Sequence, residues 1–120
     1  MAAKTTIYRG DTFKGTINLR LKDSYDANKV NPFAIEAGST IEVRFPGTTS
    51  PVVLSTANVG EISILDTDLS TITYEGSQVK SALLKKSVDQ AITVVVTQGV
   101  STETYTFELS KILDIKDRAN

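Results

Sequence analysis

Ser77 and Lys80 stand three residues apart, a spacing that could support nucleophilic catalysis. At the start of a helix, residues i and i+3 share a face, so the lysine amine could activate the serine hydroxyl. The Ser-Asp-Asn and Lys-Thr-Gly elements that accompany this spacing in serine enzymes are missing from the sequence. We therefore interpret Ser77 as the N-cap of a helix.

Two carboxylates, Asp66 and Asp68, could bind calcium from one side of a turn. Neither the central Gly nor the terminal Glu of a twelve-residue calcium loop is in register with them. Paired carboxylates can also hydrolyse glycosidic bonds, but most of the four Tyr and four Phe fall at inward positions of predicted strands. We interpret Asp66 and Asp68 as an acidic turn and expect no metal and no cofactor.

The composition argues further against catalysis. The chain has 120 residues, no Cys and no His. It therefore lacks a thiol nucleophile, a disulfide framework and the usual general base near neutral pH. We expect a single domain over residues 1–120 that is not an enzyme and has no small-molecule ligand.

Charge and hydropathy exclude two classes of partner. The 13 basic and 14 acidic residues are interspersed, so no surplus of Lys and Arg favours nucleic acid. The apolar runs are far shorter than the ~20 residues that span a bilayer. Residues 1–6 lack the apolar core of a signal peptide, and we expect synthesis in a cytoplasm, with no membrane partner.

The tripeptide Arg9-Gly10-Asp11 spells an integrin-binding motif. Adhesive use of this motif needs an exposed loop on a secreted protein, whereas here the tripeptide lies between two predicted strands. Gly and Asp are typical turn residues. We therefore interpret the tripeptide as a turn.

Alternating apolar and polar residues predict an all-β protein. Val, Ile and Thr are abundant, and these side chains suit a pleated surface. Period-two alternation bounded by turn residues predicts seven to nine short strands. The candidate segments are 5–8, 13–21, 40–45, 52–54, 61–65, 72–74, 92–96, 104–109 and 112–115. This pattern favours an antiparallel β-sandwich, with a hairpin joining the strands on either side of residues 98–101.

One segment has helical rather than alternating spacing. Val79 and Leu83 lie four residues apart, and cationic residues follow them. We predict a two-turn helix over residues 78–85, with Leu83 or Leu84 filling one end of the sandwich.

The longest irregular stretch, residues 22–39, is a candidate binding loop or flexible insertion because connections in compact domains usually have ~4–6 residues. Tyr25, Phe33 and Ile35 are apolar exceptions in a polar segment. Phe33 and Ile35 must either fold back onto the sandwich or dock onto another chain, and the sequence leaves both alternatives open.

The order of these segments resembles a known family. The sequence opens with Ile7-Tyr8-Arg9-Gly10-Asp11-Thr12-Phe13 and an alternating strand, and continues with Ala37-Gly38-Ser39-Thr40-Ile41-Glu42-Val43-Arg44-Phe45. Ile72-Thr73-Tyr74, Ala82-Leu83-Leu84-Lys85 and the strand from Gln90 to Thr97 follow in the same order. This order resembles small immunoglobulin-like modules of tailed-bacteriophage virion proteins, such as the N-terminal domain of upper baseplate proteins.

The resemblance implies a non-enzymatic virion structural protein in the tail, baseplate or neck, made in the bacterial host cytoplasm. Capsid decoration and a carbohydrate- or cell-surface-binding module stay open as alternatives. We expect a homo-oligomer that also contacts other virion proteins, because edge strands of a sandwich can pair with neighbouring chains. The expected edge is either Thr5–Tyr8 or Ile112–Ile115. The candidate partner-binding residues are Tyr25, Phe33, Ile35, Ile112 and Ile115.

Overall fold

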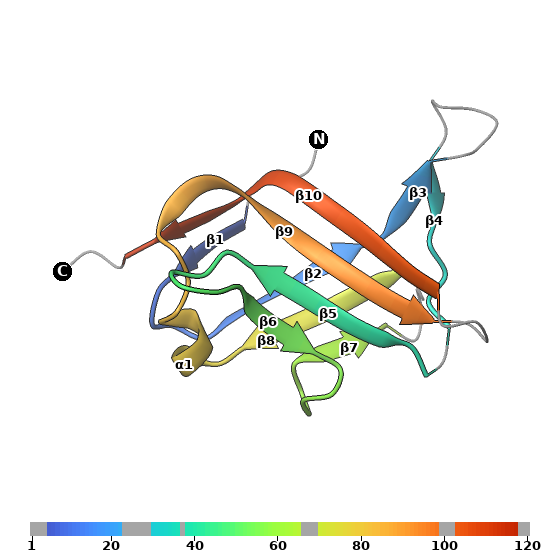
Figure 1. The fold of residues 1–120 in the computed structure, drawn as a ribbon, viewed down its shortest axis with the longest axis horizontal. Helices are drawn as coiled ribbons and strands as arrows, with labels where there is room; N and C mark the ends of the chain where they lie inside the picture. Colours follow the sequence, from blue (N-terminus) through green and yellow to red (C-terminus); the bar gives the residue numbers. More distant parts are fainter. Residues whose placement is uncertain (1–4, 23–29, 37, 66–69, 99–102, 118–120) are drawn as a thin grey trace.

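The computed structural model describes residues 5–22, 30–36, 38–65, 70–98 and 103–117 as an all-β fold (Figure 1). The strands are β1 (Thr5–Tyr8), β2 (Phe13–Asn18), β3 (Arg20–Lys22), β4 (Val30–Pro32), β5 (Thr40–Phe45), β6 (Val52–Ser55), β7 (Ile62–Ile64), β8 (Thr71–Gly76), β9 (Ser87–Gln98) and β10 (Glu103–Lys116). One helix, α1 (Gln78–Ser81), precedes β9. The all-β prediction is confirmed, although the described strands number ten rather than seven to nine.

Two main sheets organise the strands. The larger sheet is curled and has the order β1-β10-β9-β5-β6, and the smaller has the order β2-β8-β7. β9 and β10 pair as antiparallel neighbours on either side of residues 99–102, which lie outside the described residues. β1 runs parallel to β10, with Thr5 opposite Leu113 and Tyr8 opposite Lys116. The expected wholly antiparallel arrangement is therefore wrong at this pair, where the first and last strands meet.

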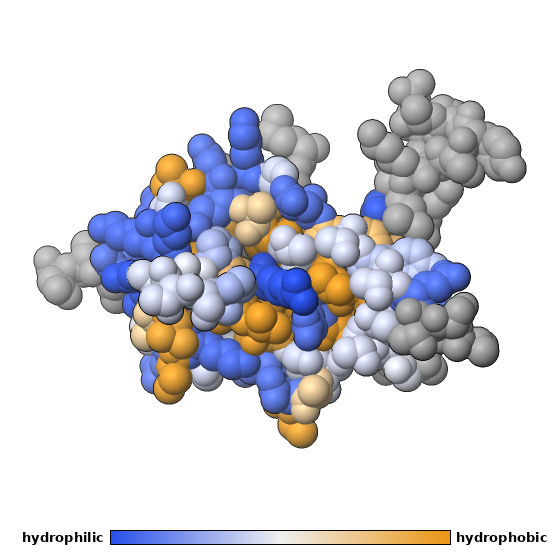
Figure 2. All heavy atoms as spheres, in the orientation of Figure 1, coloured by the Kyte–Doolittle hydropathy of each residue, from blue (hydrophilic) through white to orange (hydrophobic). Residues whose placement is uncertain are grey.

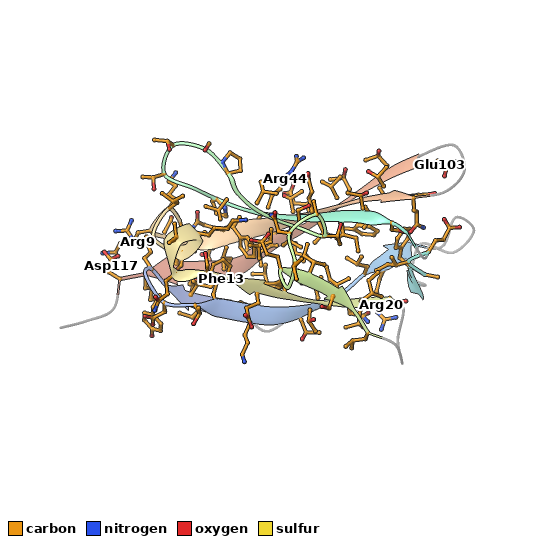
Figure 3. All side chains as sticks on the ribbon, turned by 90° about the horizontal axis from the view of Figure 1, so that it is seen from below. Arg9, Phe13, Arg20, Arg44, Glu103 and Asp117 are labelled. Carbon is orange, nitrogen blue, oxygen red and sulfur yellow. The ribbon has the colours of Figure 1, made fainter. Side chains whose placement is uncertain are left out.

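The core lies between the two sheets (Figure 3). The period-two alternation places one face of each strand inward, so the fully buried side chains come from both sheets. Phe13 and Phe45 meet edge to face with ring centroids 5.2 Å apart. Gly76 lies opposite Phe13, where an added Cβ would come within 2.1 Å of the Phe13 ring. The two sheets therefore meet through aromatic packing that requires glycine on β8.

β10 is one long bent strand where the sequence suggested two segments. Its ladder with β9 shifts register between Leu109 and Leu113, and again between Leu113 and Ile115. Lys111 at the first shift has a φ of 56°, in the left-handed region. Such bulges bend a strand, and this bend lets the end of β10 pair with β1.

The 22–39 stretch contains strand structure, because β3 ends at Lys22 and β4 covers Val30–Pro32. β3 and β4 form a two-stranded antiparallel ladder in which Arg20 faces Pro32. Leu19, 1% exposed, separates β3 from β2 because its N–H donates to the Ser70 carbonyl and its carbonyl accepts from the Phe33 N–H. The predicted single strand over 13–21 is therefore split, and the predicted loop over 22–39 is too long.

The helix is shorter than predicted. Ser77 caps α1, since its hydroxyl accepts from the Lys80 N–H, as the sequence indicated. The helix stops at Ser81 rather than Lys85 because the next residues pair with the β5–β6 loop: the Thr48 N–H donates to the Leu83 carbonyl. Leu84 is fully buried and fills the end of the core, whereas Leu83 is 56% exposed.

Candidate functional site

Ion pairs in the described part of the chain lie around Asp117, around Glu61 and between Arg44 and Glu42, and the first two are joined to further polar groups. Among the described residues, no group of three or more acidic side chains could hold a metal ion. Nor does any helix in the described ranges have the length and apolar character needed to cross a membrane.

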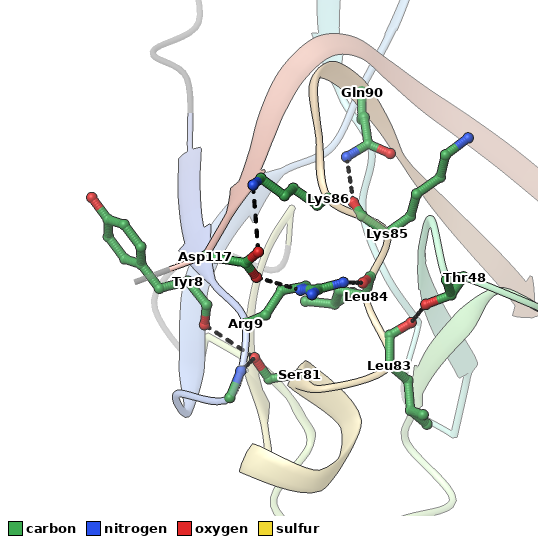
Figure 4. A network of polar contacts seen from close by, with 11 residues as sticks. Tyr8, Arg9, Thr48, Ser81, Leu83, Leu84, Lys85, Lys86, Gln90 and Asp117 are labelled. Carbon is green, nitrogen blue, oxygen red and sulfur yellow. Dashed lines mark hydrogen bonds and ion pairs between the residues drawn. The ribbon is translucent and has the colours of Figure 1, made fainter. Parts of the chain in front are cut away.

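The first cluster joins the residue after β1, the residue after β10 and the residue before β9 (Figure 4). Arg9 Nε donates to Asp117 Oδ1 at 2.7 Å, and Lys86 Nζ lies 3.4 Å from Asp117 Oδ2. The hydrogen bond from Arg9 lowers the pKa of the Asp117 carboxyl below its ordinary value. Ser81 completes the cluster: its hydroxyl donates to the Tyr8 carbonyl and accepts from the Gly10 N–H. These contacts fix the turn that follows β1.

The second cluster is the Lys80–Glu61 bridge, which links α1, β6 and the residue before β7. Lys80 Nζ donates to Glu61 Oε2 at 2.6 Å and to the Val53 carbonyl at 2.8 Å. Glu61 Oε1 accepts from the Ser55 N–H at 3.0 Å and from Asn58 Nδ2 at 2.9 Å. The Glu61 side chain is only 15% exposed, so the bridge is largely shielded from water.

The electrostatics of this bridge favour the ionised carboxylate. Burial raises the pKa of Glu61, but the hydrogen bonds from Lys80, Asn58 and the Ser55 N–H lower it by more. The net pKa of Glu61 therefore lies below its ordinary value. Glu61 is a charged acceptor at neutral pH.

β1 forms the edge of the larger sheet opposite to β6, and its surroundings differ from those of β6. The Arg9 N–H donates to the Lys116 carbonyl at 2.9 Å, which places the odd-numbered residues of β1 toward β10. The backbone of Thr6 therefore points away from the sheet. Among the described residues, no group outside the ladder bonds to Thr6. The N–H and C=O of Thr6 therefore point outward from the β1 edge.

A groove of about 290 Å³ lies beside this edge. Its lining comes from β1, the turn after it and the start of β2: Thr6, Ile7, Tyr8, Asp11, Thr12, Phe13 and Lys14. Tyr8 is 40% exposed there. The groove separates the edges of the two sheets on this side of the molecule.

A second hollow, of about 470 Å³, lies on the outer face of the larger sheet. In Figure 2 this face shows hydrophilic and hydrophobic patches side by side. Arg44, its charged lining residue, points away from the core, as Figure 3 shows. The Arg44 guanidinium is already paired with Glu42 Oε1 at 2.8 Å. This hollow is therefore lined by apolar surface and by a charge with its own partner.

Phe33 and Ile35 fold back into the core between the two sheets. They are 5% and 3% exposed, and the Phe33 ring packs against Tyr105 and Phe107, with centroids 4.9 and 5.1 Å away. Gln98 holds the segment in place by accepting from the Glu36 N–H. The sequence left open whether Phe33 and Ile35 pack within the chain or dock onto another one. In the structure they pack within the chain.

The remaining predicted partner-binding residues are not brought together. Ile112 is half-buried and Ile115 is fully buried, in a part of β10 that lies between β1 and β9. Of the two segments expected at an edge, Thr5–Tyr8 is the one that lies there. Tyr25 lies outside the described residues.

Two motifs singled out in the sequence have structural positions. Arg9-Gly10-Asp11 is a turn, with Gly10 at a φ of 92°, as predicted. The Lys80 amine contacts Glu61 and Val53, while the Ser77 hydroxyl accepts the Lys80 backbone N–H. The pair Asp66 and Asp68 lies outside the described residues.

The sequence did not single out Glu61 as a polar anchor. Glu61 is the first residue of the predicted strand over 61–65, and it lies 19 residues before Lys80. No local pattern joins them, because the contact depends on how α1 packs beside β6. The spacing of Lys80 from Ser77 marks it as a candidate for activating the serine, but in the structure its amine bonds Glu61 instead.

No protein-family model, curated protein or solved structure matches this chain.

Proposed function

We propose that the protein is a non-enzymatic structural protein of a tailed-bacteriophage particle, an immunoglobulin-like β-sandwich that assembles through its β1 edge. The observation that supports this most directly is the unequal treatment of the two edges of the larger sheet. β6 is covered by the Lys80–Glu61 bridge, whereas the Thr6 backbone on β1 faces outward. Exposed N–H and C=O groups on an edge strand form a template for another strand.

The chemistry of β1 suits strand addition. None of the residues Thr5–Tyr8 is charged, and charged side chains on an edge are a common means of preventing pairing. β2, an edge of the smaller sheet, carries the exposed Lys14 instead. A strand added at β1 would extend the larger sheet over the adjoining groove, where Tyr8 offers an exposed ring.

The placement in a phage particle rests on the order of segments from Ile7 to Thr97, which resembles the immunoglobulin-like modules of virion proteins. Two facing sheets with a shared core are consistent with such a module. The favoured positions are the tail, baseplate or neck, with the chain made in the bacterial cytoplasm. Its partners are further copies of itself and neighbouring virion proteins.

Substituting Thr6 tests the β1 edge. Proline is tolerated on an edge strand where its missing N–H would face outward, so Thr6→Pro removes the outward donor and keeps the β1–β10 ladder. Thr6→Val keeps the N–H and is the matched control. By sedimentation velocity, wild type and Thr6→Val should form oligomers, and Thr6→Pro should be a folded monomer. Oligomers of folded Thr6→Pro equal to those of wild type would contradict assembly through β1.

Quantitative mass spectrometry of purified particles tests the location. A copy number in a multiple of three or six supports the tail, baseplate or neck, because these assemblies have closed rotational symmetry. Hundreds of copies would replace that assignment with capsid decoration. Absence from particles, together with a strictly monomeric purified protein, would overturn the proposed function.

A further inference from the structure

The Lys80–Glu61 bridge occupies two of the outward backbone groups that a new strand would need at β6, the Val53 carbonyl and the Ser55 N–H. In the β5–β6 ladder, Arg44 faces Val53 and Glu42 faces Ser55. Backbone groups along an antiparallel strand point alternately toward the neighbour and away from it. Val53 and Ser55 are two residues apart, so their N–H and C=O groups point in the same direction.

That direction is outward, away from β5. The Thr56 N–H donates to the Ile41 carbonyl on β5 at 3.0 Å, so the even-numbered residues of this segment face inward. The Val53 carbonyl and the Ser55 N–H face the other way and are bonded by Lys80 and Glu61. The Ser55 carbonyl accepts from the Asn58 N–H. An ammonium and a carboxylate thus stand where a neighbouring strand would supply an N–H and a C=O.

The bridge is held in place by the elements around it. Lys80 lies on α1, whose first turn is capped by Ser77. Beyond α1, the Lys85 N–H donates to the Pro46 carbonyl, which attaches this segment to the β5–β6 loop. Because the Lys80 backbone is fixed at both sides, its amine reaches β6 with little loss of freedom on forming the bridge.

We propose that Lys80 and Glu61 determine the specificity of assembly by closing the β6 edge to strand pairing, so that of the two edges of the larger sheet only β1 accepts another chain. The part of this proposal that concerns β1 rests on the proposed function. The closure of β6 does not, because it follows from the contacts at Val53 and Ser55. A bridge with only a stabilising role would lower stability when broken without creating a new association.

The test uses Thr6→Pro protein, in which the β1 edge lacks its outward N–H. In this background, Lys80→Gln should convert a monomer into species of at least twice the mass as concentration rises, measured by sedimentation velocity. Lys80→Arg, which keeps the charge and the donors, should remain monomeric. Lys86→Gln is the matched control, since Lys86 is an exposed lysine that pairs with Asp117 and does not touch β6.

Amide hydrogen exchange by NMR locates the new association. In dilute Lys80→Gln protein, the Ser55 amide should exchange roughly tenfold faster than in the Thr6→Pro parent, because Glu61 loses its anchor. At high concentration the exchange should slow again as a second strand covers β6. Glu61→Ala removes the acceptor itself and gives an independent variant with the same expected result if Lys80→Gln fails to fold.

Two outcomes separate this inference from the proposed function. Folded, monomeric Lys80→Gln and Glu61→Ala proteins at every concentration, in the Thr6→Pro background, would overturn the closure of β6. If wild-type protein does not assemble but the bridge variants do, the proposed use of β1 fails while the closure of β6 stands.

Discussion

The two edges of the larger sheet are treated in opposite ways. At β6, two charged side chains from other elements bond the outward-facing Val53 carbonyl and Ser55 N–H. At β1, the outward backbone of Thr6 has no such cover among the described residues. An unprotected edge in an isolated sandwich is a hazard for uncontrolled association. Under the proposed function, this difference directs strand pairing to the uncovered β1 edge and away from the covered β6 edge.

The largest expected effect comes from removing the side chain that holds β1. Ile7 is 4% exposed, and Ile7→Ala should lower the free energy of unfolding by about 2–4 kcal/mol in a urea titration, because it leaves a cavity under the edge strand. It should also abolish assembly. Val79→Ala, at a position 77% exposed, should change stability by less than about 0.5 kcal/mol. Equal losses for the two variants would contradict the placement of Ile7.

A smaller loss is expected at the covered edge. Glu61→Ala leaves the Lys80 amine and the Ser55 N–H without their acceptor, and should lower the free energy of unfolding by about 2 kcal/mol. Glu42→Ala breaks the exposed pair with Arg44 and should cost less than about 1 kcal/mol. A Glu61 variant no less stable than the Glu42 variant would show that the bridge contributes little to the fold.

Weakening the helix that holds Lys80 should have a smaller effect still. Ser77→Ala removes the cap of α1 and should lower the free energy of unfolding by about 1 kcal/mol. The Ser55 amide should then exchange faster, although Ser77 is not in contact with it. Thr48→Ala is a comparison variant at the C-terminal side of α1, because it removes a hydroxyl that donates to the Leu83 carbonyl. Unchanged Ser55 exchange in Ser77→Ala would argue that α1 does not position the bridge.

The smallest expected effect is a pH dependence. The folded pKa of Glu61 lies below its ordinary value of 4.5, so the stabilisation from its ionised form is fully present above that pH. It should be lost as the pH falls from 4.5 through the lower folded pKa, because the unfolded chain takes up the proton first. Asp117 also has a lowered pKa, so the difference between wild type and Glu61→Gln isolates Glu61. Parallel stability curves for the two proteins through this range would contradict the assignment.

Sequence patterns predicted where the strands lie better than which strands lie side by side in a sheet. The alternation of Ile41, Val43 and Phe45 predicts β5 because burial on one face of a strand has a period of two. The same alternation does not indicate which strand lies at an edge, and Ile112–Ile115 and Thr5–Tyr8 were therefore equal candidates. Their order in the sheet depends on the bend at Lys111, which no local pattern marks.

The candidate site was less predictable for the same reason. Phe33 and Ile35 were visible as apolar residues in a polar stretch, but only the packing against Tyr105 and Phe107 decides their role. The contact between Lys80 and Glu61 joins elements that are adjacent only after the two sheets have come together. Long-range contacts between charged residues leave no periodic signal in a sequence.

One hydrogen-exchange measurement compares the two edges directly. In wild-type protein, the Ser55 amide should be protected at every concentration because Glu61 accepts its hydrogen bond. The Thr6 amide should exchange rapidly in dilute solution and become protected as the concentration rises and chains pair at β1. Protection of Ser55 that rises with concentration while Thr6 stays rapid would contradict the central claim, because it would place assembly at β6.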